Sequence, residues 1–587
     1  MIRQRLKQLQ SQIIEKDIDL YYMNTSDYHM SEYVPEYFKT IAYFTGFTGS
    51  LATLLVSSSE AYIFVDGRYH TQADKQCQKN GVKVVKLGLP GSLEPLEFIN
   101  QKFHGKTIGF DGKRTSISFV KSLISQNNKI RSIDIYSSIM KDRAPLVQNE
   151  IHELKNKYTG LPRRKKLELI QYCLNGKTHI VNNLEAIAYI LNLRGSDIAY
   201  TPVFLSYLVF FKKDIFLFCD SSKLNDNVLD SLYADGIIIR PYDAYYNQLD
   251  LISKQTIILD ENKVNFETYK RISANKNKII NKRSLIDDMK SIKNNVEQEN
   301  SKKAHIYDGV AMLRFLMWID SIDKTAVDEY DVARKIDEFR LSYKAFDLSF
   351  NSIVAYNENA AIIHYSPEKG KAKRLDNQGI LLVDTGGQYY EGTTDITRTI
   401  SLGPVSDEIK KHFTLVLKSM FNLSETKFIK GINGQLLDVI ARKDLWAENL
   451  DYRHGTGHGI GHISSVHEGP PNIRYMNSDT GIEKVELKPG MIVSDEPGVY
   501  IEGSHGVRCE NLLLCKPHGK SEYGEFLKFE TLTLVPFDLK LIDKRYLDNH
   551  TLEVLNNYHQ RVYKTLLPYL NEDEAKFLRR ITREIWK

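Results

Sequence analysis

The chain has 587 residues, of which 42% are hydrophobic and 26% are charged. These values are typical of globular proteins, exclude a disordered, collagenous or disulfide-dense chain, and at ~100–200 residues per domain predict about three or four domains. The net charge of +5 is too small over this length to indicate a nucleic-acid or anionic-membrane partner.

Neither a membrane span nor a secretory signal is predicted. The most apolar stretch, residues 203–219, is interrupted by Lys212, Lys213 and Asp214, so it lacks the ~20 apolar residues that cross a bilayer and favours a β-hairpin. The basic N-terminus has no apolar run after it, and an organellar transit peptide is a minor alternative there. The five cysteines include no CxxC pair, so we expect no disulfide framework, no zinc knuckle and a cytoplasmic location.

The first part of the chain alternates helix and strand patterns. Residues 2–13 have the apolar period of a helix, residues 19–23 read as a strand, and residues 61–65 alternate as a second strand. This order indicates an α/β domain. The charged segment 140–160 is the expected boundary at its end.

The same order of elements returns after Pro162. A helix to residue 173, a strand at 179–181, a helix at 185–193 and the hairpin that ends at residue 220 are expected in turn. The repeat predicts a second α/β domain and indicates a weak internal duplication.

The sequence changes character from Leu285 onward. Residues 293–318 form a long helical pattern with few breakers, so a third domain is expected to begin there. Helix period returns from Leu547 to the end of the chain. Between these parts, three short apolar runs have the length of buried strands: 379–383, 491–494 and 511–515.

Two aspartates of this third domain are candidates for metal binding. Asp384 ends an apolar run, and Asp395 follows a glycine-containing turn, so a hairpin would bring them together. A carboxylate that ends a buried strand costs several kcal/mol unless a partner or a cation balances it. In a purely structural interpretation, Arg398 would be that partner.

Four histidines follow within fourteen residues. The alternating glycines at 455–461 disfavour an α-helix, and no Glu follows the first histidine as in a zincin, so a tight loop is expected. No Lys follows these glycines, which excludes a phosphate loop. The histidines are His454, His458, His462 and His467.

Two further apolar runs each carry one glutamate. Strand alternation places Arg508 and Glu510 on the same face, whereas the neighbours Asp495 and Glu496 point in opposite directions. Only one of these two can therefore share the site, and alternation does not decide which. The alternative without a metal is a glutamate paired with Arg508.

Together these blocks offer four carboxylates and one or two imidazoles. Such hard donors suit Mn²⁺ better than a thiolate-type zinc site, and the acids would repel one another without about two cations. The expected centre is therefore dinuclear. Two ions a few ångströms apart are the apparatus of metal-assisted hydrolysis.

These blocks resemble the pita-bread metallopeptidases, specifically the long cytosolic form of aminopeptidase P. Weaker matches in the first two segments include Asp66-Gly-Arg-Tyr and Asn192-Leu-Arg-Gly-Ser-Asp, so nearly the whole chain is accounted for. The motifs that carry the resemblance are Ala361-Ile-Ile-His364-Tyr, Asp384-Thr-Gly, Gly-Thr-Thr-Asp395-Ile-Thr-Arg-Thr, His454-Gly-Thr-Gly-His458-Gly, Val466-His-Glu-Gly-Pro, Asp495-Glu-Pro-Gly and Arg508-x-Glu510-Asn.

The resemblance implies an α/β (α+β) fold with a definite domain order. Two creatinase-like N-terminal α/β domains, residues 1–155 and 156–290, would precede a pita-bread catalytic domain, residues 291–540, and a C-terminal helical extension, residues 541–587. A cytoplasmic homodimer is expected, with no nucleic-acid or membrane partner.

The same resemblance implies the roles of the site residues. Tyr500 and Arg508 would orient the neighbouring groups, and His462 has no matching role. Three histidines, His364, His454 and His467, would line the substrate site. The implied metal ligands are Asp384, Asp395, His458, Glu496 and Glu510, which selects Glu496 over Asp495.

The implied activity is hydrolysis of the N-terminal Xaa-Pro bond of peptides with proline at the second position. A hydroxide held between two divalent ions, Mn²⁺ or alternatively Zn²⁺ or Co²⁺, would attack the carbonyl while Glu496 accepts its proton. An Xaa-Pro dipeptidase (prolidase) and a non-catalytic peptide-binding scaffold of the same fold are the alternatives. Members of this fold that bind no metal would lack metal-ligating residues, whereas all five implied ligands are present in this sequence.

Overall fold

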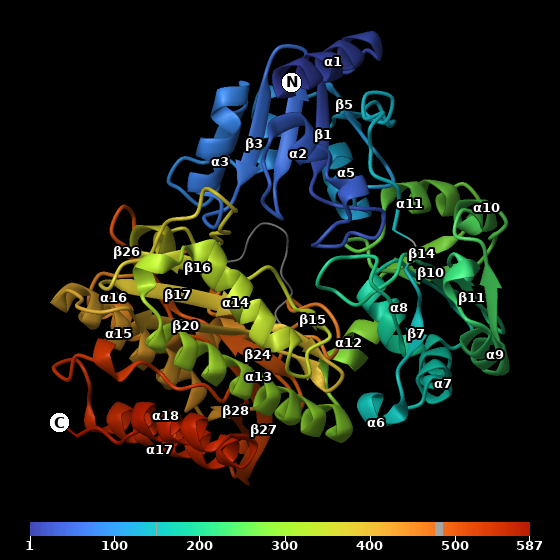
Figure 1. The fold of residues 1–587 in the computed structure, drawn as a ribbon. Coiled ribbons are helices and arrows are strands. Elements are labelled where there is room, and N and C mark those ends of the chain that lie inside the picture. The colour runs from blue at the N-terminus through green and yellow to red at the C-terminus, as the bar shows by residue number, and fades with distance from the viewer. Residues whose placement is uncertain (148, 476–484, 587) are drawn as a thin grey trace. The chain divides into compact units, whose positions relative to one another are not determined.

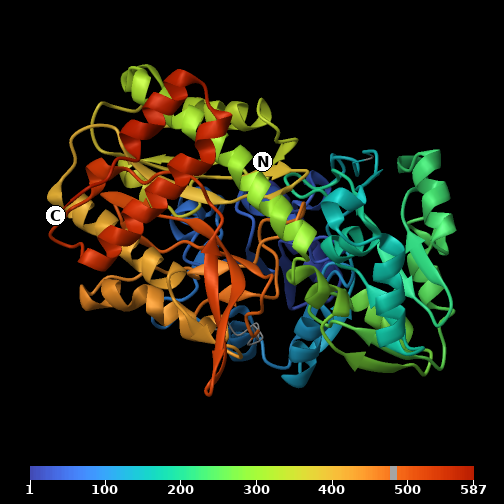
Figure 2. The same cartoon turned by 90° about the horizontal axis from the view of Figure 1, so that it is seen from below.

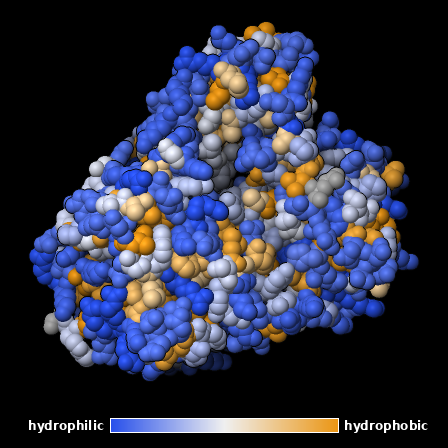
Figure 3. All heavy atoms as spheres, in the orientation of Figure 1, coloured by the Kyte–Doolittle hydropathy of each residue, from blue (hydrophilic) through white to orange (hydrophobic). Residues whose placement is uncertain are grey.

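The computed structural model describes residues 1–147, 149–475 and 485–586. It divides into two compact units, Met1–Asp288 and Met289–Lys587. None of the described helices has both the length and the apolar character needed to cross a bilayer. Hydrophilic residues cover most of the face in Figure 3, where apolar residues form small separate patches.

The first unit begins with a six-stranded sheet (Figure 1). Helices α1 (Ile2–Glu15), α2 (Thr40–Thr45) and α3 (His70–Cys77) pack on one face, and α4 (Pro95–Lys102) and α5 (Ile117–Ser125) on the other. The predicted first helix is confirmed, and it buries Leu6, Leu9 and Ile13. The strands in sheet order are β4 (Lys83–Lys86), β3 (Ala61–Val65), β2 (Thr53–Ser57), β1 (Leu20–Asn24), β5 (Thr107–Phe110) and β6 (Lys129–Ser132).

A second six-stranded sheet in this unit repeats the topology of the first. In both sheets two antiparallel pairings adjoin the third strand in sheet order, and the remaining pairings are parallel. The repeat predicted from the sequence is therefore present in the fold. Its strands in sheet order are β12 (Ile237–Arg240), β11 (Ile215–Phe218), β10 (Tyr207–Phe210), β8 (Thr178–Val181), β13 (Thr256–Leu259) and β14 (Lys278–Asn281).

The two sheets meet through equivalent residues. Ser116 and Asn265 cap the N-termini of α5 and α11 (Phe266–Ser273), and their backbones pair with one another. The amides of Ser118 and Glu267 then donate to the carbonyls of residues 261 and 112. The remaining elements are α6 (Asn156–Thr159), α7 (Arg163–Leu174), α8 (Leu184–Leu191), α9 (Asp226–Ala234), α10 (Ala244–Leu249), and the short strands β7 (His152–Glu153) and β9 (Leu193–Arg194).

Two antiparallel sheets of the second unit are each covered on one face by a pair of helices. One sheet has the order β16 (Ile353–Tyr356), β17 (Ile380–Thr385), β20 (Ile396–Ser401), and α13 (Asn295–Ser321) and α14 (Glu329–Leu341) pack on it. Figure 1 shows these two helices crossing in front of β17 and β20. Outward-facing apolar side chains such as Leu381 and Val383 form this contact, so the residues between them face the interior.

The other sheet has the order β21 (Phe428–Ile429), β28 (Gly524–Thr531), β27 (Asn511–Ser521), β24 (Ile492–Asp495). Helices α15 (Asp407–Ser424) and α16 (Gly434–Ala447) cover it through Val493, Leu513 and Cys515. Strands β27 and β28 continue beyond the sheet as the long hairpin visible in Figure 2.

The C-terminal helices complete the core of the second unit. Helices α17 (Asn549–Leu566) and α18 (Glu572–Ile581) pack Leu555, Val562 and Leu578 with residues of α13 and α15. The predicted C-terminal helical segment is thus packed into the unit. Helix α12 (Leu285–Ser291) contains the point where the chain passes from the first unit to the second. The remaining strands of the second unit are β15 (Asp347–Leu348), β18 (Gly387–Tyr389), β19 (Gly392–Thr393), β22 (Gly457–His458), β23 (Asn472–Ile473), β25 (Gly498–Ile501) and β26 (His505–Arg508).

A pair of buried histidines links α15 to the hairpin β25–β26, which carries Tyr500 and Arg508. His412 Nδ1 lies 2.8 Å from His505 Nε2, so a single proton can occupy this contact. Burial lowers the pKa of both rings. The pKa of His412 falls to about 4, because the neighbouring His505 lowers it further, while Glu408 opposes the shift. Lys411 further lowers the pKa of His412, and Ser504 Oγ lies 2.8 Å from the far nitrogen of His505.

This pair predicts a loss of stability in acid. Between the ordinary imidazole pKa of 6.5 and about 4, the unfolded chain binds protons that the folded pair does not, so stability falls as the pH falls through this window. The thermal unfolding temperature should fall more between about pH 7.5 and about pH 5 in the wild type than in His412→Asn. The exposed His518→Asn should follow the wild type. An equal drop in the wild type and His412→Asn would contradict the assignment.

Candidate metal centre

Asp384 and Asp395 lie close together at the end of paired strands. Asp384 is on β17 opposite Thr397 of β20, and Asp395 directly precedes β20. The connection between them forms β18 and β19 rather than a simple hairpin turn. Both aspartates are buried, and they face the interior, opposite to the residues that contact α13 and α14.

Arg508 is the partner of Asp384. Its Nη2 lies 2.6 Å from Asp384 Oδ2, its Nη1 donates to the Tyr500 hydroxyl at 2.8 Å, and its Nε donates to Thr397 Oγ1 at 3.1 Å. The structural interpretation that paired Arg398 with Asp384 is therefore wrong. On β20, Arg398 points opposite to Thr397 and donates to the carbonyl oxygens of Glu510 at 2.6 Å and Val535 at 2.7 Å.

The histidine segment forms a close-packed loop, as predicted. His458 lies on β22, which pairs with β23. A Cβ on Gly457 would lie 1.9 Å from the carbonyl oxygen of Ser494, and one on Gly459 would lie 2.0 Å from that of Glu468. Glycine is required at these two positions because the loop lies directly against neighbouring backbone.

The ring of His458 turns its Nε2 toward the acids. Its Nδ1 lies 3.0 Å from the carbonyl oxygen of Gly459, which can only accept, so Nδ1 carries the proton. Nε2 lies 3.4 Å from Glu496 Oε1 and 3.6 Å from Asp395 Oδ2. In metal sites, the ring nitrogen that does not bind the metal commonly donates a hydrogen bond of this kind, which orients the histidine.

The two glutamates complete the cluster. Glu496 shares the inner side of its strand with Ser494, whose hydroxyl donates to Glu496 Oε1 at 3.2 Å. Asp495 points the other way, and its carboxylate oxygens have no hydrogen-bond partner in the described part of the chain. Glu510 Oε2 accepts from Thr397 Oγ1 at 2.8 Å. The structure thus places Glu496, not Asp495, beside His458.

Burial and mutual repulsion dominate the electrostatics of these acids. Burial raises the pKa of Asp395 and of Glu510 well above the usual range, and the neighbouring carboxylates raise both further. Burial raises the pKa of Glu496 to about 7, with Arg508 opposing the shift and Asp384 adding to it. Without added positive charge, these groups would hold protons near neutral pH.

The donor set fits divalent cations. Single ligand atoms of Asp395, His458 and Glu510 lie within 4.8 Å of one another. Among the described residues, Asp384 Oδ1 and Glu510 Oε1 are buried without a hydrogen-bond partner. Four ionised carboxylates against one arginine leave a net charge of about −3, which two divalent ions would balance, and oxygen donors with one imidazole suit hard ions.

One of the three predicted substrate histidines contacts a residue of the cluster, and a second contacts Tyr500. The His467 ring lies 4.3 Å from the His458 ring at 85°. His454 Nδ1 lies 2.8 Å from the Gly455 carbonyl oxygen, so its Nε2 accepts the proton of the Tyr500 hydroxyl, which lies 2.8 Å away. His364 lies in the turn after residues 357–361, a segment that packs on β26.

Several supporting residues were not assigned from the sequence. His462, interpreted as an ordinary loop residue, is buried with Nδ1 3.5 Å from Ser301 Oγ on α13. Glu468, which adjoins His467, is buried within 3.1 Å of Lys293 Nζ and 3.4 Å of Lys290 Nζ. These partners lie more than 150 residues away in the chain, so no local pattern indicates them.

The sequence matches known families over four consecutive ranges. Residues 5–144 and 142–297 each match the Creatinase/Prolidase N-terminal domain. Residues 299–517 match metallopeptidase family M24, and residues 525–585 match the C-terminal region of peptidase M24. The predicted fold class, two creatinase-like α/β domains before a pita-bread catalytic domain, is confirmed.

Similar proteins cover the full length of the chain. A probable Xaa-Pro aminopeptidase P from Tuber melanosporum is 35% identical over 617 residues, covering 99% of each chain. One from Aspergillus flavus is 34% identical, covering 100% of this chain and 93% of its own. An Xaa-Pro dipeptidase from Bacillus anthracis, 22% identical with a TM-score of 0.50 over 64% of this chain and 98% of its own, shares the fold.

A solved structure matches over the whole length as well. The crystal structure of X-prolyl aminopeptidase from Caenorhabditis elegans, described as a cytosolic enzyme with a di-nuclear active site, has a TM-score of 0.93 and 30% identity over 100% of both chains. Sequence and structure thus agree over all matched ranges. The chain belongs to the Xaa-Pro aminopeptidase P family of the M24 metallopeptidases.

Proposed function

We propose that the chain is a metal-dependent aminopeptidase that hydrolyses the N-terminal Xaa-Pro bond of peptides. The observation that carries this proposal is the convergence of the carboxylates of Asp384, Asp395, Glu496 and Glu510 with Nε2 of His458 at one site, where three of the four acids are buried. The full-length similarity to Xaa-Pro aminopeptidases P supports the substrate class.

The proposed ligands of two divalent ions are Asp384, Asp395, His458, Glu496 and Glu510. We propose Mn²⁺ as the native metal, with Zn²⁺ or Co²⁺ as alternatives, because oxygen donors outnumber nitrogen donors. When bound, such ions polarise the scissile carbonyl and lower the pKa of water. Arg508 and Thr397 hold the carboxylates of Asp384 and Glu510 in place from the side.

Glu496 is suited to hold and pass a proton. Its carboxylate oxygen Oε1 lies 3.4 Å from His458 Nε2, within the proposed ligand set, where a carboxylate can act as a general base toward a water bound there. An Xaa-Pro bond ends in an imide nitrogen, which carries no hydrogen and must gain one to leave. We propose that Glu496 receives the proton of the attacking water and delivers it to that nitrogen.

The Arg508–Tyr500–His454 chain orients the substrate side. Arg508 donates to the Tyr500 hydroxyl, and this hydroxyl donates to His454 Nε2. The donor and the acceptor of each hydrogen bond in this chain are therefore fixed. Burial raises the pKa of Tyr500 to about 12, which keeps its hydroxyl protonated. We propose that His454, His467 and His364 line the substrate site. The imidazoles of His467 and His364 would stabilise developing negative charge at the scissile carbonyl. Both nitrogens of His454 are engaged, so its role is to orient Tyr500.

We further propose a cytoplasmic location and a homodimeric assembly. The description of the Caenorhabditis elegans enzyme as cytosolic supports the location. The assembly is a prediction from the family resemblance and is open to direct measurement of the molecular mass in solution.

The first prediction concerns which bond is cut. Given peptides that begin Arg-Pro-Pro, the metal-loaded enzyme should release only the first residue, because an acid-rich site suits a cationic α-amine. Mass spectrometry identifies the products. N-acetylated peptides should resist cleavage, since acetylation removes that charge.

The same assay separates this activity from that of a dipeptidase. An aminopeptidase needs room on the carboxyl side and should have a kcat/KM for Xaa-Pro-Xaa at least equal to that for Xaa-Pro. A clear preference for the dipeptide, or cleavage of N-acetylated peptides, would overturn the aminopeptidase assignment. If the metal-loaded protein hydrolyses neither substrate, the remaining interpretation is a non-catalytic peptide-binding scaffold.

A second prediction concerns Glu496. Glu496→Gln should lower kcat by about a hundredfold or more, because an amide cannot accept a proton in the reaction. The matched control is Glu502→Gln, the same substitution at an exposed position of the β25–β26 hairpin, which should retain activity within about twofold. Thermal unfolding of the metal-free variants establishes that both fold. Equal activities with intact folds would contradict the role of Glu496.

A further inference from the structure

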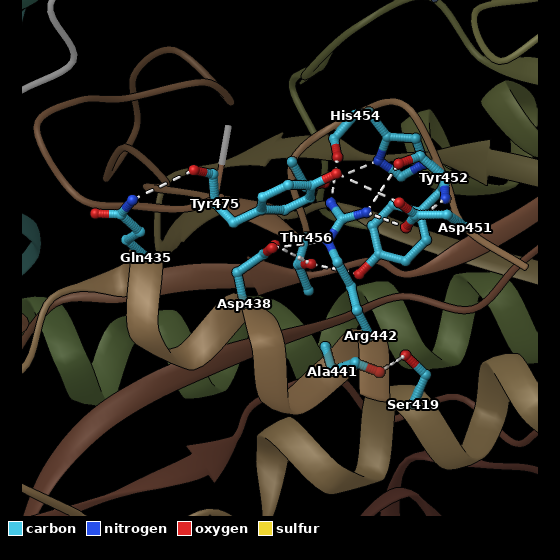
Figure 4. A network of polar contacts seen from close by, with 11 residues as sticks. Ser419, Gln435, Asp438, Ala441, Arg442, Asp451, Tyr452, His454, Thr456 and Tyr475 are labelled. Carbon is cyan, nitrogen blue, oxygen red and sulfur yellow. Dashed lines mark hydrogen bonds and ion pairs between the residues drawn. The ribbon is translucent and has the colours of Figure 1, made fainter. Parts of the chain in front are cut away.

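A buried arginine on α16 binds the segment that carries His454. Arg442 is 1% exposed, and its Nε donates to Asp438 Oδ2 at 2.7 Å within the same helix. Its Nη1 donates to the Tyr452 carbonyl oxygen at 2.8 Å and to Asp451 Oδ1, and its Nη2 donates to the His454 carbonyl oxygen at 2.7 Å. Figure 4 shows the guanidinium surrounded by this segment. Three of these four bonds therefore hold residues 451–454.

Aromatic rings fix the plane of the guanidinium. Its central carbon lies 3.7 Å from the centre of the Tyr452 ring and 4.7 Å from that of Tyr475. A planar fork can contact rings and donate to several acceptors in its plane at once, whereas a lysine ammonium is a point charge. The site thus requires arginine geometry rather than positive charge alone.

Asp438 ties two hydroxyl groups of the same segment to the helix. It is fully buried, and its Oδ1 accepts from Thr456 Oγ1. Since that hydroxyl donates its proton to the carboxylate, it accepts in turn from the Tyr452 hydroxyl. Arg442 and Asp438 together hold residues 451–456 at both backbone and side-chain level (Figure 4).

This segment leads directly to the reacting groups. His454 Nε2 accepts from Tyr500, as described above. The carbonyl oxygen of Thr456 accepts from the Glu496 amide at 2.8 Å. Two residues later, the His458 amide donates to Ser494 Oγ at 3.0 Å, and that hydroxyl also contacts Glu496. A shift of residues 451–456 would therefore move His454 and the backbone of Glu496 together.

We propose that Arg442, with Asp438, is a positioning residue for catalysis that acts through His454 and Glu496. This inference rests on the proposed function of the site. The alternative is an ion pair that only stabilises the fold. Buried ion pairs are often replaceable by apolar residues at no cost in stability, so stability alone does not require this fork. Catalysis is more demanding, because a misplacement of about 1 Å costs up to about a hundredfold in rate.

The test compares Arg442→Lys with a matched control. Arg163 on α7 is also buried, and it pairs with Asp235 at 2.7 Å, with Glu153 at 3.2 Å and with the Leu191 carbonyl oxygen at 3.2 Å. Arg442→Lys should lower kcat by about tenfold or more with KM changed less than about twofold, since the lost interaction acts in the transition state. Arg163→Lys should keep both constants within about twofold.

A double-mutant cycle with His454→Ala separates positioning from general damage. If Arg442 acts through His454, the loss from Arg442→Lys should be much smaller in the His454→Ala background than in the wild type. Equal losses in both backgrounds would contradict action through His454. Thr456→Val is a milder second variant that removes one bond to Asp438. It should lower kcat about threefold, and it keeps the proposal testable if Arg442→Lys does not fold.

Hydrogen exchange gives a readout that does not depend on activity. Arg442→Lys should speed amide exchange in residues 450–458, and Arg163→Lys should not. If the wild-type protein cleaves Xaa-Pro bonds but Arg442→Lys leaves both exchange and kcat unchanged, the inference is wrong and the proposed function stands. If exchange increases but the wild type cleaves no Xaa-Pro peptide, the proposed function fails and the structural part of the inference stands.

Discussion

The repulsion among four clustered carboxylates, three of them buried, is the constraint on which the second unit depends. Asp384, Asp395, Glu496 and Glu510 approach from two sheets, where burial and mutual repulsion raise the pKa of three of them: Asp395, Glu496 and Glu510. Arg508 contributes one positive charge, against Asp384. Ionised acids at this spacing therefore require divalent cations. The same ions would supply the chemistry that hydrolyses a peptide bond.

The rest of the unit holds these mutually repelling side chains in fixed positions. Strand alternation divides each sheet into an outer face that packs on helices and an inner face that carries acids, as Val383 and Asp384 illustrate. Backbone carbonyls fix which nitrogen of His454 and of His458 carries hydrogen. The lysines that bind Glu468 and the arginine that binds residues 451–454 then hold the histidine loop from outside the cluster.

Local patterns in the sequence predicted several of the helices and strands, and they indicated the clustered residues except for the choice between Asp495 and Glu496. Helix period predicted α1 and α13, and the repeated helix–strand order predicted the second six-stranded sheet. Alternation alone left Asp495 and Glu496 undecided, although the family resemblance selected Glu496. The wrong prediction and the unassigned supporting residues involve contacts between residues that are distant in the chain. Arg508 rather than Arg398 pairs with Asp384 across 124 residues, and no local pattern encodes that choice.

The most direct test of the central claim is anomalous diffraction from crystals of the Mn²⁺-loaded protein. The account predicts two anomalous peaks within coordination distance of Asp384, Asp395, His458, Glu496 and Glu510, with Nε2 of His458 toward one of them. Absence of metal from this cluster in fully loaded protein, or a single ion bound by other residues, would contradict it.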